Sequence, residues 1–195
     1  MLDVETVEDP AAVAALMDPL RARILSELTE PRSAANLAER VGLTRQKVNY
    51  HLRALEQRGL AEVAEERRWG GLTERRMVAT SASYVVSPDA LGPVASAPER
   101  VEDRLSASYL IAVAARAVRE VGRLMRLARK QDKRLATLSI DTQIDFGSPA
   151  DRAAFTRELG EAISGLVARY HQPNASDGRL HRLVVFAHPF EERPQ

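Results

Sequence analysis

Residues 33–59 read S-A-A-N-L-A-E-R-V-G-L-T-R-Q-K-V-N-Y-H-L-R-A-L-E-Q-R-G, and this stretch decides the fold of the N-terminal part of the chain. The pattern predicts two short helices that meet at Gly42. Ser33 caps the first helix with its hydroxyl, and Gly42 ends it because glycine readily adopts the left-handed backbone conformation. Thr44 caps the second helix. Two helices joined in this way are typical of a helix-turn-helix, whose second helix enters the major groove of DNA.

The second helix of this pair has an apolar side and a polar side. Val48, Leu52 and Leu55 recur at i, i+4 and i+7, so they form a stripe that packs against the first helix. The opposite side carries donors and mixed donor and acceptor groups that suit phosphates and base edges. Together with the capping threonine, the candidate DNA-binding residues of this helix are Thr44, Arg45, Gln46, Lys47, Asn49, Tyr50 and Arg53. An ordinary solvated helix face is the alternative interpretation.

A basic hairpin is predicted directly after this helix. Residues 60–69 and 73–86 have the composition of strands, and Gly70-Gly71 is the turn signal between them. Four arginines gather near the turn, where they could contact phosphates or reach into the minor groove. These candidate DNA-binding residues are Arg67, Arg68, Arg75 and Arg76. For any one of them, a solvated hairpin tip is the alternative.

Three runs of sequence occur together in the first 87 residues: D-P-L-R-A-R-I-L-S-E-L at 18–28, L-A-E-R-V-G-L-T-R-Q-K-V-N-Y-H-L-R-A-L-E-Q-R-G-L at 37–60, and E-R-R-W-G-G-L-T-E-R-R-M-V-A-T at 66–80. In combination they resemble the ArsR-type winged helix-turn-helix regulators of bacteria, over roughly residues 10–87. The resemblance implies a homodimeric repressor that leaves its operator, or changes its hold on it, when an effector arrives. Metal-sensing members commonly use cysteine thiolates or clustered His and Asp ligands. This chain departs from them because it has no cysteine.

Composition and charge are consistent with a DNA-binding domain followed by a second module. The chain has 195 residues, of which 45% are hydrophobic, enough for one sizeable core or two modest ones. The formal net charge is only +1, so attraction to nucleic acid must come from local clustering. Residues 44–76 contain eight basic and five acidic side chains, whereas residues 1–43 contain four basic and eight acidic ones. The basic excess therefore coincides with the helix-turn-helix and the hairpin.

The sequence also favours a reducing compartment and a soluble protein. Without cysteine there are no disulfides, thiolate metal sites or thiol redox sensors. The N-terminus is acidic where a secretory signal would be basic, and the longest apolar stretch, 109–115, is far below the ~20 residues that cross a bilayer. We therefore expect a cytoplasmic protein that has no cofactor and no contact with a membrane.

Two further helices are predicted ahead of the helix-turn-helix. Asp9-Pro10 and Asp18-Pro19 each place a capping carboxylate before a proline, which is well suited to the first helical position. Apolar stripes follow each start and are expected to pack under the second helix of the helix-turn-helix. They comprise Val13, Leu16 and Met17 in the first helix, and Leu20, Ile24, Leu25 and Leu28 in the second, which Pro31 should end.

A linker and a long helix are predicted next. Residues 88–98 contain three prolines and mark a linker. Ser96 and Glu99 form a capping box, so the helix should run from Glu99 to about Asp132 and span roughly 50 Å. An apolar stripe along it, from Val101 to Ala128, predicts contact with a partner subunit. The arginines on its other side are expected to form a solvated face: Arg116, Arg119, Arg123, Arg126 and Arg129.

The last part of the chain is predicted to add two strands and a helix. Residues 137–146 alternate strictly between apolar and polar, residues 149–170 are amphipathic, and residues 183–187 form a short apolar run. The expected fold class is thus mainly α with α+β character, ending in a small αβαβ module. The sequence leaves open whether the two strands pair with each other or across a dimer. We expect a DNA-binding domain at 1–87, a linker at 88–98, and a dimerisation and effector-binding module at 99–195.

Catalysis and metal binding find little support. Asp141 and Asp145 share a strand face, which for carboxylates alternating with Ser and Gln usually means solvent exposure. A metal site would rest on a loose set without tight ligand spacing: His171, His181, His188 and Glu191. His51 is expected to be a packed scaffold residue. The C-terminal module either holds a small-molecule effector between its layers or only dimerises, and no residue identifies a ligand.

The predicted function is a dimeric, sequence-specific DNA-binding transcriptional regulator acting on two-fold-symmetric double-stranded DNA. The alternative is an interaction module in which the winged fold binds an acidic protein and shows little affinity for any duplex. Salt dependence separates the two, because a DNA-binding regulator should lose affinity steeply as salt rises.

Overall fold

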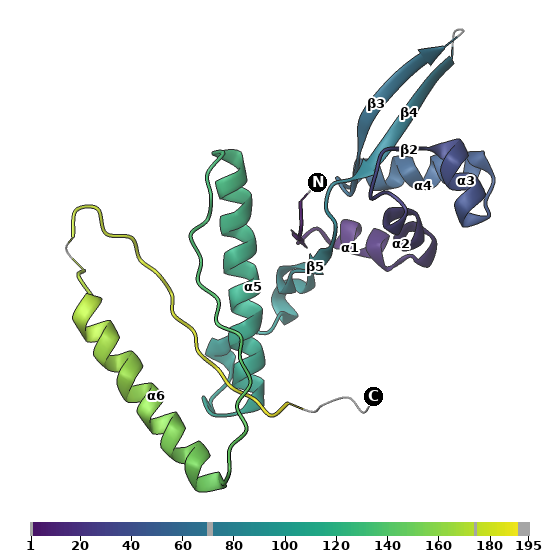
Figure 1. Cartoon of the computed structure of the whole chain (residues 1–195). Coiled ribbons are helices and arrows are strands. Elements are labelled where there is room, and N and C mark those ends of the chain that lie inside the picture. Colours follow the sequence, from purple (N-terminus) through teal and green to yellow (C-terminus); the bar gives the residue numbers. More distant parts are fainter. Residues whose placement is uncertain (1, 70–71, 174, 191–195) are drawn as a thin grey trace. The chain divides into compact units, whose positions relative to one another are not determined.

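The computed structural model describes residues 2–69, 72–173 and 175–190, and its chain divides into two compact units (Figure 1). The first unit is Met1–Leu135 and the second is Ala136–Gln195. The long helix of the chain thus groups with the N-terminal elements. The functional division into residues 1–87, 88–98 and 99–195 stays a prediction. Mainly helical structure with small sheets is the fold class that the sequence predicted.

Four short helices form the body of the first unit: α1 (Pro10–Met17), α2 (Pro19–Ser26), α3 (Ala34–Val41) and α4 (Arg45–Gln57). Both aspartate start signals are confirmed. The Asp9 carboxylate accepts from the Ala12 N–H at 3.1 Å, and that of Asp18 accepts from the Leu20 N–H at 2.9 Å. Two details of these helices were predicted wrongly.

The apolar stripe of α1 and the end of α2 differ from the prediction. Met17 is 68% exposed, and the small residues Ala12 and Ala15 are the buried ones on α1. α2 ends at Ser26, well before Pro31, because the chain turns at Glu27 and its N–H bonds back to the α2 carbonyls. Leu28 still reaches the core from this turn and is fully buried.

The turn between α3 and α4 has the predicted geometry. Gly42 has φ 69° and lies in the left-handed region, where a side chain would add strain. Ser33 Oγ accepts from the Asn36 N–H at 3.4 Å, and Thr44 Oγ1 accepts from the Lys47 N–H at 3.3 Å. The side chains between the two helices are buried, and Leu37 and Leu55 are fully enclosed.

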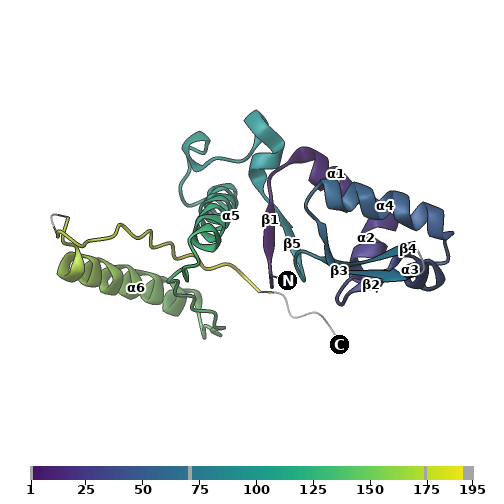
Figure 2. The same ribbon diagram turned by 90° about the horizontal axis from the view of Figure 1, so that it is seen from above.

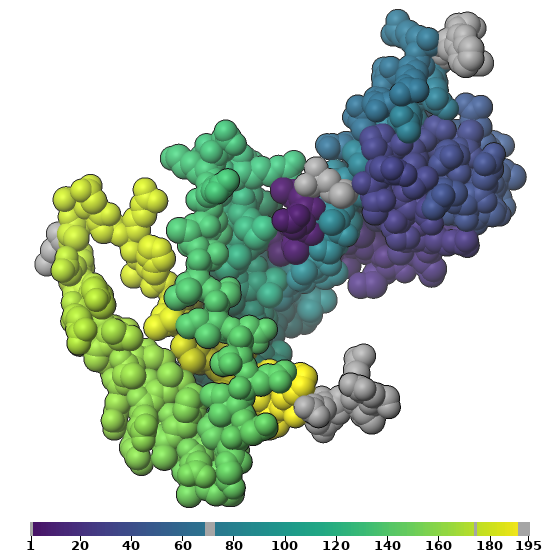
Figure 3. Space-filling model, viewed as in Figure 1, coloured from purple at the N-terminus to yellow at the C-terminus, as the bar shows by residue number. Residues whose placement is uncertain are grey.

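A three-stranded antiparallel sheet completes this domain. Its strands are β2 (Arg32–Ser33), β3 (Ala61–Trp69) and β4 (Leu72–Ala79), in the order β2-β4-β3. The hairpin of β3 and β4, here called the wing, projects beyond the helices (Figure 3). The predicted turn at Gly70-Gly71 lies outside the described residues. β2 was not predicted, since two residues give no readable alternation.

The second strand of the hairpin ends earlier than predicted. β4 stops at Ala79, and the chain then turns and forms a separate strand, β5 (Tyr84–Val86). Two hydroxyls fix the turn: Thr80 Oγ1 donates to the Gly59 carbonyl at 3.0 Å, and the Tyr84 hydroxyl donates to the Leu60 carbonyl at 2.8 Å. β5 pairs in parallel with β1 (Glu5–Val7), a strand that the sequence analysis missed.

Figure 2 shows helices α1, α2 and α4 beside strands β3 and β4, and one hydrophobic core joins these elements. Every helix from α1 to α4 contributes to it, as do β1, β3 and β4. Its buried members are Val7, Ala12, Ala15, Ile24, Leu25, Leu28, Ala34, Leu37, Val41, Val48, Leu52, Leu55, Leu60, Ala61, Met77 and Ala79. The core thus fixes α4 from behind and leaves its other side free of packing.

The predicted linker and the start of the long helix need correction. Residues 88–100 contain two 3-10 helices, η1 (Pro88–Val94) and η2 (Pro98–Arg100), and the long helix α5 spans Ala107–Lys130. Its cap is Ser106, whose Oγ accepts from the Tyr109 N–H at 3.1 Å, so the predicted start at Glu99 was wrong. Glu99 instead pairs with Arg116 at 3.2 Å. With 24 residues, α5 is about 36 Å long.

Three of the five α5 arginines are not the solvated residues that we predicted. Besides the Arg116 pair, Arg119 donates to the Ser96 carbonyl at 2.9 Å and lies 3.5 Å from the Asp89 carboxylate. Arg126 donates to the Thr6 hydroxyl at 3.1 Å and pairs with Glu8. These arginines therefore bind α5 to β1 and to the 3-10 segment.

In its described residues the second unit contains one helix, α6 (Pro149–Tyr170), capped by Ser148, whose Oγ accepts from the Asp151 N–H at 3.1 Å. The predicted strands at 137–146 and 183–187 are not strands in the described residues, so the αβαβ order is wrong. A strand needs hydrogen-bonding neighbours, and neither segment has one there. Leu138 and Ile140 are each 82% exposed, so the apolar side chains of the alternating segment are not packed against another element.

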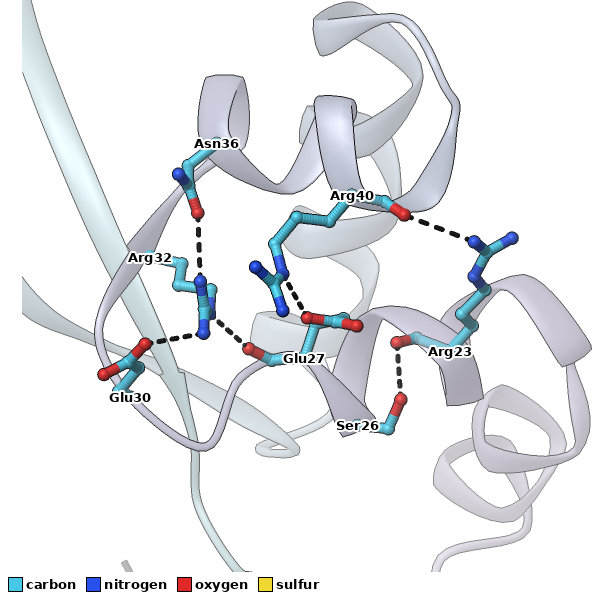
Figure 4. Close-up of polar contacts among 7 residues, drawn as sticks. All are labelled: Arg23, Ser26, Glu27, Glu30, Arg32, Asn36 and Arg40. Carbon is cyan, nitrogen blue, oxygen red and sulfur yellow. Dashed lines mark hydrogen bonds and ion pairs between the residues drawn. The ribbon is translucent and has the colours of Figure 1, made fainter.

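Polar contacts join α2 and the turn after it to α3 and β2 (Figure 4). Arg40 on α3 hydrogen-bonds the Glu27 carboxylate, and Arg23 donates to the Arg40 carbonyl at 3.2 Å. Arg32 donates to the Glu27 carbonyl at 2.8 Å and pairs with Glu30 at 2.6 Å. The hydrogen bond from Arg40 lowers the pKa of Glu27, with smaller contributions from the charges of neighbouring arginines.

This pKa shift predicts how stability depends on pH. Because the folded-state pKa of Glu27 is below its unfolded value, its contribution is present above the ordinary carboxyl pKa and is lost as the pH falls through the lowered value. Thermal unfolding should therefore show Glu27→Gln less stable than the wild type at pH 7, with the difference shrinking as the pH falls through the acidic range. Glu39→Gln, an exposed change on α3, is the control. A difference that persists unchanged at pH 3 would contradict the prediction.

Gly122 allows α5 to lie directly on β1, and this contact yields a second prediction. A Cβ at Gly122 would lie 2.2 Å from Thr6 Oγ1. Gly122→Ala should therefore cost about 1–3 kcal/mol by overpacking, although alanine is the better helix former. Denaturant unfolding measures the loss, and adding Thr6→Ala should recover part of it. In Gly160→Ala, where the added Cβ meets open space, stability should not fall. A Gly122→Ala protein as stable as the wild type would contradict this contact.

Candidate nucleic-acid interface

The outer side of α4 is an exposed polar surface. Val48, Leu52 and Leu55 are at most 4% exposed, whereas Tyr50 is 66% exposed. The division into a buried and an exposed side is the one predicted from spacing. All six polar candidates along the helix are exposed: Arg45, Gln46, Lys47, Asn49, Tyr50 and Arg53. The Thr44 hydroxyl, by contrast, is engaged in capping the helix.

Two hollows lie at this surface, and three residues of α4, Arg45, Asn49 and Arg53, line both of them. One lies over the outer side of α4 and is lined by Arg45, Gln46, Asn49, Tyr50 and Arg53. The other, here called the wing groove, lies between α4, the start of α3 and β4. It is lined by Ser33, Ala34, Ala35, Arg45, Asn49, Leu52, Arg53, Glu56, Thr73, Glu74, Arg75 and Met77. The shared residues are spaced at i, i+4 and i+8, so they form one stripe along the helix.

The register of the wing separates its arginines into two faces. Arg67 is opposite Glu74 and Arg68 is opposite Thr73, while the pairs nearer the helices are Glu66 with Arg75 and Glu65 with Arg76. Directly opposed residues share a face of the sheet, and successive residues alternate. Arg68 and Arg75 therefore share one face, and Arg67 and Arg76 share the other. The side chains of residues 69 and 72 lie outside the described set.

Carboxylates hold three of the four wing arginines. Arg75 meets Glu56 of α4 at 2.5 Å and Glu66 at 3.6 Å. Glu65 takes both Arg76 at 2.9 Å and Arg67 at 3.2 Å. The hydrogen bond from Arg76 lowers the pKa of Glu65, and the one to Glu56 raises the pKa of the Arg75 guanidinium.

Arg68 differs from the other wing arginines, since it makes no ion pair with any residue that the structure describes. The glutamates of residues 44–76 entered the charge balance of this region, but the sequence did not indicate which arginines they pair with. The register of the hairpin would have predicted two of these partners, because Glu66 is opposite Arg75 and Glu65 is opposite Arg76. No local sequence pattern predicts the contact between Glu56 and Arg75, because the two residues belong to different elements.

The remaining candidates are not among the residues that line these two hollows. His51 is half-buried, and its ring meets that of Tyr50 edge-on with centroids 5.4 Å apart. Asp141 and Asp145 belong to the second unit and are exposed. In the described part of the chain, no three His, Asp or Glu side chains gather as metal ligands would. Glu191, part of the loose metal set, lies outside the described residues.

Part of this region is similar to a known family. Residues 16–64 match a family model described as a helix-turn-helix domain. The match runs from the end of α1 into β3, so it includes α4 and its polar side. In domains of this kind the second helix of the motif is the one that reads DNA.

Two solved structures are similar to parts of this chain. NolR from Sinorhizobium fredii is 26% identical over 36% of this chain and 67% of its own, with a TM-score of 0.31. The homodimeric winged helix-turn-helix DNA-binding domain of Mb0332 from Mycobacterium bovis, described as a possible ArsR-family transcriptional regulator, is 17% identical over 65% of this chain and 85% of its own, with a TM-score of 0.30. No curated protein matches the chain. Among the described residues, no helix has both the length and the apolar character to cross a bilayer.

Proposed function

We propose that this protein is a sequence-specific DNA-binding transcriptional regulator that acts as a homodimer. The observation that carries the proposal is the exposed polar side of α4 on a helix whose apolar side is fixed in the core. Insertion into a major groove requires a helix that is held in place and exposes hydrogen-bond donors along one side. The helix-turn-helix match over 16–64 supports the same role.

The two sets of candidate residues take different parts in this proposal. Arg45 and Gln46 read base edges, because they come first on the exposed side of α4. The remaining candidates bind phosphates and set the position of the helix without reading sequence. These phosphate contacts are Thr44, Lys47, Asn49, Tyr50, Arg53, Arg67, Arg68, Arg75 and Arg76.

The exposed side of α5 supports homodimer formation. Apolar residues follow a spacing of four and three along this side, opposite the arginines that bind α5 to β1, and such a repeat is typical of paired helices. The stripe is Leu110, Ala114, Ala117, Val121, Leu124 and Ala128. Val121 is 39% exposed and Leu124 is 43% exposed. Pairing of two such stripes would bury these side chains and present two α4 helices to a two-fold-symmetric operator.

The repressor role and the effector follow from the resemblance to ArsR-type regulators. The second unit exposes many apolar side chains, among them Leu138 and Ile140, which supports a role for it in binding an effector or in further dimer contacts. No described cluster of side chains selects an effector. A cytoplasmic location follows from the proposed role.

The competing function is an interaction module that binds an acidic protein through the wing. The ion pairs within the wing bear on both functions alike, because an acidic protein and a DNA phosphate would each have to displace a carboxylate from the same three arginines. Affinity that is low for every duplex would favour the module over the regulator.

The division of roles predicts different effects on DNA affinity. Arg45→Ala or Gln46→Ala should cost about 1–3 kcal/mol on the preferred duplex and much less on random duplex, since base contacts supply discrimination. Arg68→Ala should weaken both duplexes alike and make the salt dependence shallower by about one unit. Fluorescence anisotropy with a selected and a scrambled duplex, from 50 to 300 mM salt, measures both quantities. Equal affinity of the wild type for the two duplexes would overturn sequence-specific regulation.

The α5 stripe predicts how the oligomeric state responds to charge. Leu124→Glu should shift the protein toward monomer, because two carboxylates would meet in the paired stripe. Analytical ultracentrifugation across a concentration series measures the shift. Leu105→Glu is the matched control, since Leu105 precedes α5 and is already 98% exposed. If both variants keep the wild-type dimer, the stripe is not the dimer contact.

A further inference from the structure

The wing groove collects cationic groups from two elements. Arg45 and Arg53 face it from α4, and Arg75 faces it from β4. Neutral hydrogen-bonding side chains lie between them, including Asn49 and Thr73. Three guanidiniums around one hollow attract an anion, and guanidinium matches the geometry of a phosphodiester.

A carboxylate of the protein itself already satisfies one of these guanidiniums. Both terminal nitrogens of Arg75 donate to Glu56, Nη2 to Oε1 at 2.5 Å and Nη1 to Oε2 at 3.2 Å. This is the two-pronged arrangement that arginine makes with carboxylate and with phosphate alike. Glu56 lies at the C-terminal end of the same stripe that carries Arg45 and Arg53, and it also lines the groove.

We propose that the wing groove seats a DNA backbone phosphate and that Glu56 is an internal competitor for it. In free protein Arg75 binds the Glu56 carboxylate, and on duplex DNA Arg75 exchanges this carboxylate for a phosphate. The inference rests on the proposed DNA-binding function and adds to it a defined phosphate site and a residue that opposes its filling.

The exchange is feasible because the ion pair is accessible and weak. The Arg75 side chain is 41% exposed and that of Glu56 is 33% exposed. Pairs exposed to this degree typically change an equilibrium by a few-fold at most, and the two-pronged geometry places this pair toward the upper end of that range. A phosphate entering the groove has Arg45 and Arg53 among its neighbours as well as Arg75, while a second lining carboxylate, Glu74, opposes it.

Competition by Glu56 would act on every sequence equally. It opposes a backbone contact and touches no base-reading residue, so it lowers total affinity without changing the ratio between specific and random duplex. It also reduces the salt dependence, because the freed carboxylate takes up a cation as the phosphate releases one. The consequence is a protein that leaves non-specific DNA more readily.

The test compares full-length wild type, Glu56→Gln, Arg75→Gln and the double variant on a selected and a scrambled duplex. Gln has the shape of Glu without its charge, and Glu62→Gln is the control because Glu62 is exposed on β3 outside the groove. Fluorescence anisotropy over a salt series gives affinity and slope, and circular dichroism checks folding. Glu56→Ser is a second variant, for use if Glu56→Gln unfolds.

We expect Glu56→Gln to bind both duplexes roughly two- to five-fold more tightly at low salt, the factor that an exposed ion pair implies, and to steepen the salt slope by about one unit. Arg75→Gln should remove this gain in the double variant. If Glu56→Gln behaves like Glu62→Gln while the wild type binds DNA, the pair only ties the wing to α4 and the inference is overturned. If the wild type binds no duplex, the proposed function itself fails.

Discussion

The burial of one side of α4 is the constraint on which the remaining structure depends. Leu52 and Leu55 point into a core built from three other helices and the sheet, so the helix can neither rotate nor slide without exposing them. Gly42 sets the angle at which the helix leaves α3. Because α4 cannot rotate, the polar residues on its other side point outward.

Local signals were enough to predict the helices of the N-terminal domain, and long-range pairing was not. The caps Asp9, Asp18 and Thr44 act within three residues, so the sequence displays them directly. β1 was missed because its three residues form a strand only through β5, which lies almost eighty positions later. Residues 137–146 show the opposite error: a strand was predicted there and none formed. Alternation indicates which side chains would share a face of a strand, but it does not provide a second strand to hydrogen-bond with.

The candidate site shows the same limit at the level of single side chains. Spacing along α4 was sufficient to identify the exposed polar residues, because helix geometry alone determines that side. The ion pairs of the wing could not be read from spacing, because Arg75 and Glu56 approach each other through the fold and not along the chain. A local excess of positive charge therefore overstated how many arginines are free for a ligand.

The close approach of Gly122 to Thr6 gives the N-terminal residues a mechanical role. β1 is bound on one side by α5, through Arg126 and this contact, and on the other by β5. Asp9, which caps α1, follows Glu8, the residue that pairs with Arg126. Two consecutive residues, Glu8 and Asp9, thus join α5 to the start of α1, so a displacement of α5 would have to break the Arg126 pair or move the first helix of the domain that holds α4.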